Sequence, residues 1–245
     1  MALLAASEPW AMTADQAAQR QGYASRSELA LRNALEAFCR PRWPAARIVH
    51  EIVMGQGRVR ADVAVLDTAH IAAFEIKGEY DNMTRMLHQV GMYQLCVPEV
   101  WMVVPYGKHA DDCKLIRHLL PSVGLLIGNG VKGWEAHNGR RMRDIEDKEF
   151  ELVVDSEPSP RQPVTKLMLE MCWAAELAGI CDRTRTAAGK KATRPRMISA
   201  LMDLPFETLQ AEVCTALRGR DAVWRADAPF PAQPVTPPNQ EADHG

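Results

Sequence analysis

The chain has 245 residues, of which 47% are apolar and 24% are charged, which is enough for one large domain or for a medium domain followed by a small one. The formal net charge of −2 excludes a globally basic nucleic-acid-binding protein, so any nucleic-acid contact must come from local patches. The six cysteines form no C-x-x-C pair and no zinc spacing, which favours reduced thiols in a cytoplasmic protein. No apolar run approaches the roughly 20 residues that a membrane helix needs, so we expect no membrane partner.

Apolar periodicity and capping signals predict the order helix, three strands, helix, strand, helix, strand. We expect an N-terminal arm over residues 1–24, with a short helix that begins at Thr13. The predicted elements that follow are a helix from Ser25 to Phe38, strands 47–53, 58–66 and 71–77, a helix after Asp81, a strand 100–104, a helix 108–120 and a strand 124–128. This order predicts an α/β fold with a mixed sheet flanked by helices.

The central hairpin is predicted to gather charged side chains on one sheet face. A four-residue turn at 67–70 pairs Leu66 with Ile71, and counting outward places Asp62 opposite Glu75. Glu75 and Lys77 share a face because side chains alternate along a strand. Two carboxylates this close favour a hard divalent cation between them. Lys77 alone also offsets part of the charge, and an ordinary solvated face explains Glu-x-Lys equally simply.

Three further acidic residues are candidates to complete this cluster. Glu28 lies one turn before the apolar stripe of its helix, where it serves as a capping carboxylate or as a third acidic group of the site. Glu36 is the alternative on the same helix. Glu51 lies on the preceding strand and either joins the cluster or forms a salt bridge with Arg60.

The order of these residues resembles a known enzyme superfamily. The residues that carry the likeness are Asp62, Glu75-Ile76-Lys77 and Gln89-x-x-x-Tyr93, the last two being neighbours on one helix face. Together they resemble the PD-(D/E)XK, or restriction-endonuclease-like, superfamily. The stretch 51–62 with residues 75–77 is most similar to MmcB-like DNA-repair proteins and related bacterial and phage proteins. The likeness covers roughly residues 28–128, and Ala61 stands where the motif has proline.

The resemblance implies a Mg²⁺-dependent nuclease, with Mn²⁺ as an alternative ion, that hydrolyses DNA in repair, recombination or phage DNA processing. The implied metal ligands are Asp62, Glu75 and the backbone carbonyl of Ile76. Lys77 would orient or deprotonate the attacking water. Glu28, Gln89 and Tyr93 would complete the metal shell, support the site or touch substrate. The alternative is an inactive DNA-binding or adaptor module on the same fold.

The rest of the chain predicts a smaller helical part. Residues 25–153 form the nuclease-like domain, and the proline-rich stretch 154–163 is a linker by composition. Residues 164–225 are predicted to form an α-helical domain, with helices over 165–180, 197–203 and 206–217, that is a possible docking site for a protein partner. Residues 226–245 carry many prolines and few large apolar residues, which predicts a disordered tail.

The segment 183–196 is strongly basic and contains no acidic residue. It is either a solvated loop or a stretch that contacts DNA phosphates. The candidate DNA contacts in and outside it are Arg60, Lys190, Lys191, Arg194 and Arg196.

Overall fold

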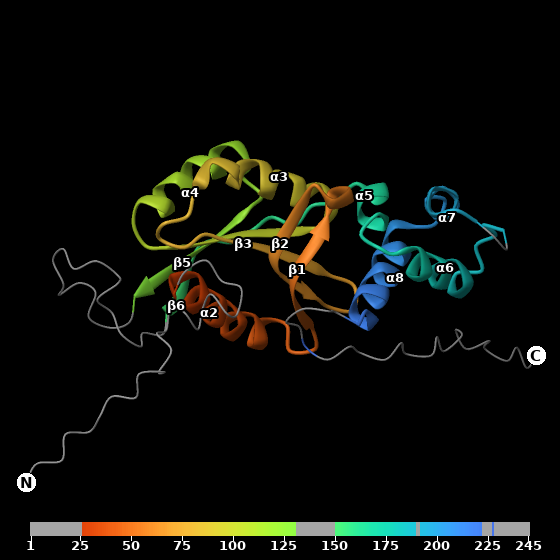
Figure 1. Cartoon of the computed structure of the whole chain (residues 1–245), viewed down its shortest axis with the longest axis horizontal. Helices are drawn as coiled ribbons and strands as arrows, with labels where there is room; N and C mark the ends of the chain where they lie inside the picture. The colour runs from red at the N-terminus through yellow and green to blue at the C-terminus, as the bar shows by residue number, and fades with distance from the viewer. Residues whose placement is uncertain (1–25, 131–149, 190–191, 222–226, 228–245) are drawn as a thin grey trace, which may run out of the picture. The chain divides into compact units, whose positions relative to one another are not determined.

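The computed structural model describes residues 26–130, 150–189, 192–221 and 227 (Figure 1). The strands are β1 (Arg47–Met54), β2 (Val59–Leu66), β3 (Ile71–Ile76), β4 (Glu99–Pro105), β5 (Gly124–Gly130) and β6 (Phe150–Ser156). The helices are α2 (Arg26–Arg42), α3 (Met86–Cys96), α4 (Lys108–Leu119), α5 (Thr165–Leu169), α6 (Ala174–Arg183), α7 (Arg194–Leu201) and α8 (Phe206–Gly219), with 3₁₀ turns η1 (Gly55–Gly57) and η2 (Met83–Arg85).

The strands form one six-stranded mixed sheet in the order β1-β2-β3-β4-β5-β6. β1 and β2 are antiparallel, with a register that runs from Arg47↔Leu66 to Met54↔Val59. β4 and β5 are parallel because helix α4 returns the chain between them, and β6 pairs antiparallel with β5. The predicted α/β fold with a mixed sheet flanked by helices is thereby confirmed.

Internal contacts divide the chain into two compact units. The first unit contains the described residues of 1–44, 74–91 and 100–160, and the second those of 45–73, 92–99 and 161–245. The predicted helical domain over 164–225 thus belongs to the same unit as the β1–β2 hairpin.

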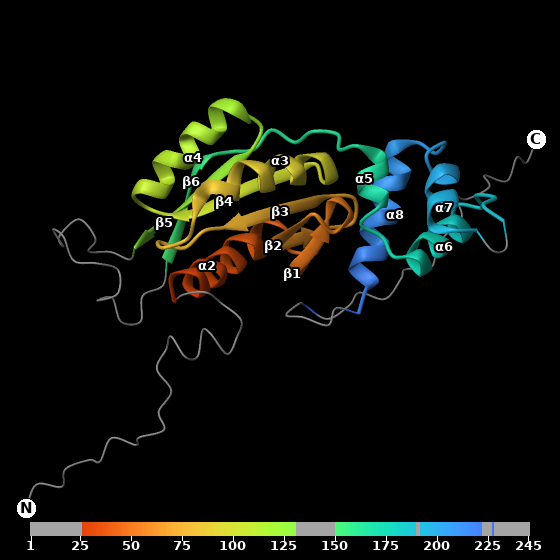
Figure 2. The same cartoon turned by 45° about the horizontal axis from the view of Figure 1, so that its top comes forward.

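The first unit is built around an aromatic core. Helices α2 and α4 cover opposite faces of β4, β5 and β6 (Figures 1 and 2). Under α2, Phe74 stacks on Trp101 with ring centroids 6.2 Å apart and planes 8° from parallel. Phe38 meets the edge of Trp101 at 6.0 Å, and Trp43 meets Phe74 at 6.1 Å. These contacts fix which face of the sheet α2 covers.

The second unit packs four short helices with the β1–β2 hairpin. Helix α8 contacts α5, α6 and β2, and α6 also contacts α7. Its apolar stripe of Leu209, Val213 and Leu217 is buried, as the helical spacing requires. Arg47, 1% exposed, donates to the carbonyls of Leu217, Arg218 and Arg220 and so satisfies the end of α8.

Two local predictions differ from the structure. The predicted linker 154–163 begins inside β6, which runs to Ser156. The single helix predicted over 165–180 is two helices, because the helix is interrupted between Leu169 and Ala174. A new helix starts there when the Glu176 carboxylate accepts from the backbone N–H of Trp173 at 2.6 Å. The predicted Thr13 helix and most of the predicted tail lie outside the described residues.

Within the described ranges, no helix combines the length and the apolar character that crossing a bilayer requires.

Candidate functional site

The acidic and basic residues of β3 form a buried ion pair. Glu75 is 1% exposed and Lys77 is 8% exposed. The Lys77 Nζ lies 2.5 Å from Glu75 Oε1. The Lys77 backbone N–H donates to the carbonyl of Val103, so the residue is held against β4 just beyond the end of β3. The predicted convergence of Glu75 and Lys77 is therefore confirmed.

This ion pair faces away from α2. Phe74 belongs to the aromatic core under α2, and adjacent strand residues point to opposite faces. Glu75 therefore points to the face that α4 covers. On α4, the pKa of the Cys113 thiol is raised to about 12, mainly by burial and also by the charge of Asp112, while the positive charge of Lys77 acts to lower it. Lys77 is thus close enough to α4 for its charge to act on Cys113.

Glu51 has an unusual backbone on the strand next to Asp62. In the β1–β2 register, His50↔Val63 and Ile52↔Ala61 bracket these two residues, so Glu51 lies across from the half-buried Asp62. Glu51 has a φ of 58°, which is strained for a residue other than glycine. Its carboxylate lies 2.5 Å from Arg60 Nε, which confirms the salt-bridge interpretation of Glu51 and gives Arg60 an internal partner.

The two helix residues of the resemblance have different environments. Tyr93 is fully buried, and its hydroxyl donates to the backbone carbonyl of Arg60 at 2.7 Å. Tyr93 therefore supports strand β2 beside Asp62. Gln89 is half-buried, and its Oε1 has no hydrogen-bond partner in the described part of the chain.

Helix α2 holds its own acidic residues. Glu28 Oε1 accepts from Arg32 Nη2 at 2.9 Å, and the Arg32 side chain is only 2% exposed. Glu36 lies two turns further along the same helix and is half-buried. Helix α2 covers the sheet face opposite to Glu75, and the part of Glu28 or Glu36 in the acidic cluster stays a prediction.

Within the described ranges, no group of three or more His, Cys, Asp or Glu side chains is arranged to share a metal ion. The ligand set predicted from the sequence is smaller: Asp62, Glu75 and the Ile76 carbonyl. Mg²⁺ is commonly held by one or two carboxylates together with water and substrate phosphate. The chemistry of this donor set therefore fits Mg²⁺, and its assembly stays a prediction.

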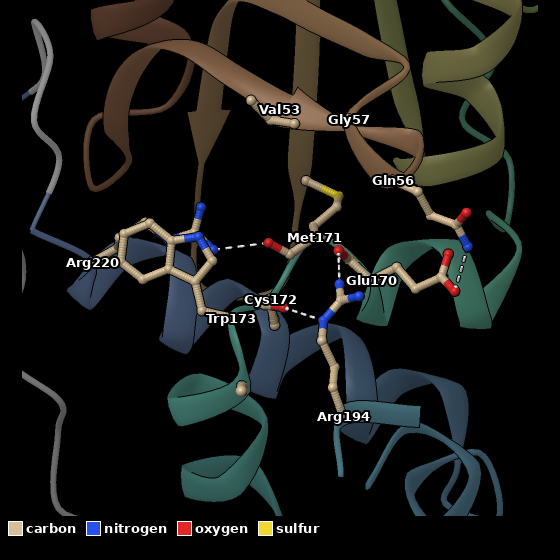
Figure 3. Close-up of a pocket in the computed structure, with 10 residues that line it drawn as sticks. Val53, Gln56, Gly57, Glu170, Met171, Cys172, Trp173, Arg194 and Arg220 are labelled. Atoms are coloured by element: carbon tan, nitrogen blue, oxygen red, sulfur yellow. Dashed lines mark hydrogen bonds between the residues drawn. The ribbon is translucent and has the colours of Figure 1, made fainter. Parts of the chain in front are cut away.

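The basic segment is partly occupied by internal contacts. Arg194 donates from Nε to the carbonyl of Cys172 at 3.3 Å and from Nη2 to the carbonyl of Glu170 (Figure 3). Arg183 pairs with Glu212 at 2.7 Å. Arg196 is exposed, while Lys190 and Lys191 lie outside the described residues. Arg194 thus connects α7 to the non-helical segment between α5 and α6.

A pocket in the second unit was not predicted from the sequence. Glu170, Trp173 and Arg220 line it together with Arg194 and Gln56 (Figure 3). No motif marks these residues, because the apolar stripe predicts a continuous helix through Glu170 and Trp173. Only the break between α5 and α6 turns them toward a common space.

A comparison with protein families places the chain. A family model described as Bacteriophage P4 protein cII matches residues 25–227. The chain belongs to the bacteriophage P4 cII family. The match includes β3 with Glu75 and Lys77 as well as all four helices from α5 to α8. Comparisons with curated proteins and with solved structures found no match.

Proposed function

We propose that this member of the P4 cII family is a metal-dependent nuclease that hydrolyses phosphodiester bonds in DNA. The observation that carries the proposal is the buried Glu75–Lys77 pair at the end of β3, with 2.5 Å between Nζ and Oε1. A buried ion pair contributes little net stability, since desolvation offsets much of the attraction. Such a pair at a strand end is therefore better explained by chemistry than by folding.

Two further features support the same reaction. The element order helix, three strands, helix, strand agrees with the superfamily that the sequence resembles. The strained Glu51 lies across from Asp62, and strained backbone is concentrated at functional sites. Glu51 itself pairs with Arg60, so the identity of a third acidic residue stays a prediction.

Each residue of the proposed site would have its own role in the hydrolysis. One Mg²⁺ or Mn²⁺ would be held by Glu75, the Ile76 carbonyl and Asp62. The place of Asp62 in this set is expected from the sequence count alone. When bound, the ion would lower the pKa of a water molecule and stabilise negative charge on the phosphate oxygens. Lys77, fixed by Glu75, orients the attacking water through a hydrogen bond and offsets negative charge as the phosphate oxygens develop it. Tyr93 holds the Arg60 carbonyl and so keeps β2 in place.

The test is cleavage of supercoiled plasmid, linear duplex and single-stranded DNA with Mg²⁺ or Mn²⁺, in wild type and in Lys77→Met and Glu75→Gln. We expect both substitutions to slow cleavage by roughly a hundredfold or more. The matched control is Lys114→Met, since Lys114 is a half-exposed lysine of α4 and should leave the rate unchanged.

Two outcomes contradict the proposal. If wild type cleaves none of the three substrates with either ion, the chain is a binding module of the kind the sequence also allows. If Lys77→Met and Glu75→Gln cleave as fast as wild type, another site performs the chemistry. Circular dichroism of each variant shows whether a lost rate reflects lost folding.

A further inference from the structure

The break between α5 and α6 opens a polar pocket that the nuclease chemistry does not use. Its volume is about 540 Å³, and all of its lining residues belong to the second unit. Its polar and aromatic lining side chains include Gln56, Glu170, Trp173, Arg194 and Arg220 (Figure 3). They come from the β1–β2 turn, the helix break, and the two helices α7 and α8 or their ends.

A buried carboxylate oxygen in this pocket lacks a donor. The Glu170 side chain is 6% exposed. Its Oε1 accepts from Gln56 Nε2 at 2.8 Å, whereas its Oε2 has no hydrogen-bond partner among the described residues. A buried acceptor without a donor is costly, more so when it is charged. The pocket therefore offers one strong acceptor to a ligand that carries an N–H or O–H group.

An aromatic platform stands beside this acceptor. Trp173 is 55% exposed, and the Arg220 guanidinium lies 4.3 Å from the ring centroid. Arg220 is itself fixed by the Glu176 carboxylate at 2.6 Å and by the Met171 carbonyl at 2.8 Å. The indole is thus held from one side by an anchored cation, and its exposed surface is available for a planar ligand.

Cations around the pocket exceed the carboxylates. Among the lining residues, Arg194 and Arg220 carry two positive charges against one negative charge on Glu170, and Arg220 is paired with Glu176 outside the lining. The two hydrogen bonds of Arg194 use N–H groups on Nε and Nη2, which is fewer than the five N–H donors of a guanidinium. Lys166 lies outside the lining, with its side chain 58% exposed and its Nζ 3.9 Å from Glu170 Oε1. An anionic group on the ligand is therefore favoured next to the planar one.

We propose that this pocket binds a nucleotide whose base carries an exocyclic amino group. The base stacks on Trp173, its amino group donates to Glu170 Oε2, and its phosphate contacts Arg194 and Lys166. Base–aromatic stacking is a general device for holding single strands. The inference deepens the proposed nuclease function, on which its assignment to DNA rests, by giving the chain a separate grip on an unpaired base.

The acceptor makes the pocket selective. Cytosine, adenine and guanine each present an amino group, whereas thymine presents an N–H between two carbonyls that repel a carboxylate. A hydrogen bond to a charged group is strong enough to separate the two classes by about tenfold in affinity. We therefore expect an unpaired dC or dA tract to bind about tenfold tighter than a dT tract.

The experiment titrates the full chain with fluorescently labelled dC, dA and dT 12-mers in EDTA, so that cleavage cannot interfere. Anisotropy reports binding, and quenching of tryptophan fluorescence reports stacking. Trp173→Ala should weaken binding of all three strands at least tenfold. Trp173→Phe should retain most of the affinity while losing most of the quenching. Unlabelled dCMP and dTMP as competitors show whether a free nucleotide suffices or whether the strand is needed.

Glu170→Gln tests the selectivity. An amide can donate to a thymine carbonyl, so the dC preference should fall to about equality with dT. The matched control is Glu207→Gln, an exposed glutamate of α8, which should keep the preference. A thermal melt of each variant checks folding, because Glu170 also binds Gln56.

Equal affinity for dC and dT in wild type, or a preference that survives Glu170→Gln, would overturn the proposal. So would unchanged affinity in a folded Trp173→Ala variant. The nuclease proposal is judged separately by cleavage in Lys77→Met. A chain that prefers dC but never cleaves DNA contradicts only the nuclease, and one that cleaves without base preference contradicts only the pocket.

Discussion

At the scale of single residues, Gly124 is required by the aromatic core of the first unit. A Cβ at this position would lie 2.4 Å from Trp101 Cε3 and 2.7 Å from Cδ2. Trp101 is fully buried and stacked on Phe74, so the ring has no room to move. We expect Gly124→Ala to lower the free energy of unfolding by about 2 kcal/mol, measured by urea denaturation.

The control is Gly91→Ala in helix α3. There a Cβ meets only Leu120 Cδ1 at 3.8 Å, an ordinary contact. Alanine favours a helix over glycine by roughly 0.5–1 kcal/mol, so this substitution should leave stability unchanged or raise it. Equal losses at Gly124 and Gly91 would show that Trp101 does not enforce the glycine.

The sequence predicts some residues of the site better than others. Strand alternation is enough to place Glu75 and Lys77 together, because the period of two is fixed by the backbone. The φ of 58° at Glu51 cannot be predicted from the sequence, since no glycine or turn signal marks that position. The sheet face that α2 covers also needs the structure, because the Phe38–Trp101 contact is what shows it.

At the scale of elements, Arg47 connects the first strand to the last helix. It donates to three carbonyls that follow or end α8, and its Nε donates to the carbonyl of Asp227 at 2.9 Å. Arg47→Met should therefore remove this donor from the carbonyls at the end of α8, although the Leu217 carbonyl keeps the Arg220 backbone N–H at 3.3 Å. We expect a loss of about 3 kcal/mol in the free energy of unfolding, and a smaller loss for Arg47→Lys.

Arg58→Met is the matched control, because Arg58 is exposed at the turn before β2. It should change the unfolding midpoint in urea little. If Arg47→Met is as mild as Arg58→Met, the end of α8 does not depend on this side chain.

Elements with one clear periodicity are the ones that the sequence predicts. The three strands of the hairpin region, α4 and α8 all start within a few residues of the predicted positions. β6 is missed because its apolar residues border a proline-rich stretch whose composition indicates a linker. The break at 170–173 is missed because a carboxylate from the following turn, and not a glycine or proline, starts α6.

At the scale of the whole molecule, buried thiols make the fold sensitive to alkaline pH. Burial raises the pKa of Cys96 to about 11 and those of Cys113, Cys172 and Cys214 to about 12, from 9.0. The unfolded chain therefore loses these protons first as pH rises. The contribution of the protonated buried thiols to the stability of the folded chain is complete below pH 9 and is lost progressively up to about pH 12.

Cys214→Val isolates this effect, since Cys214 is fully buried in α8. Relative to its own value at pH 8, the variant should keep about 2 kcal/mol more of its unfolding free energy at pH 11 than wild type does. Urea denaturation at several pH values measures the difference. Parallel curves for the two proteins would show that the Cys214 thiol ionises equally in the folded and unfolded chain.

Asp227 affects whether the sheet can pair with another copy of the chain. β1 is at one end of the strand order, and an end strand offers unpaired N–H and C=O groups on which another chain can be added. Asp227 donates its N–H to the Ile48 carbonyl at 2.9 Å and accepts the Ile48 N–H on its carboxylate at 2.8 Å. The family match also ends at this residue. A single residue near the C-terminus thus blocks part of the open sheet edge against aggregation, and a chain shortened before it would present that edge to its neighbours.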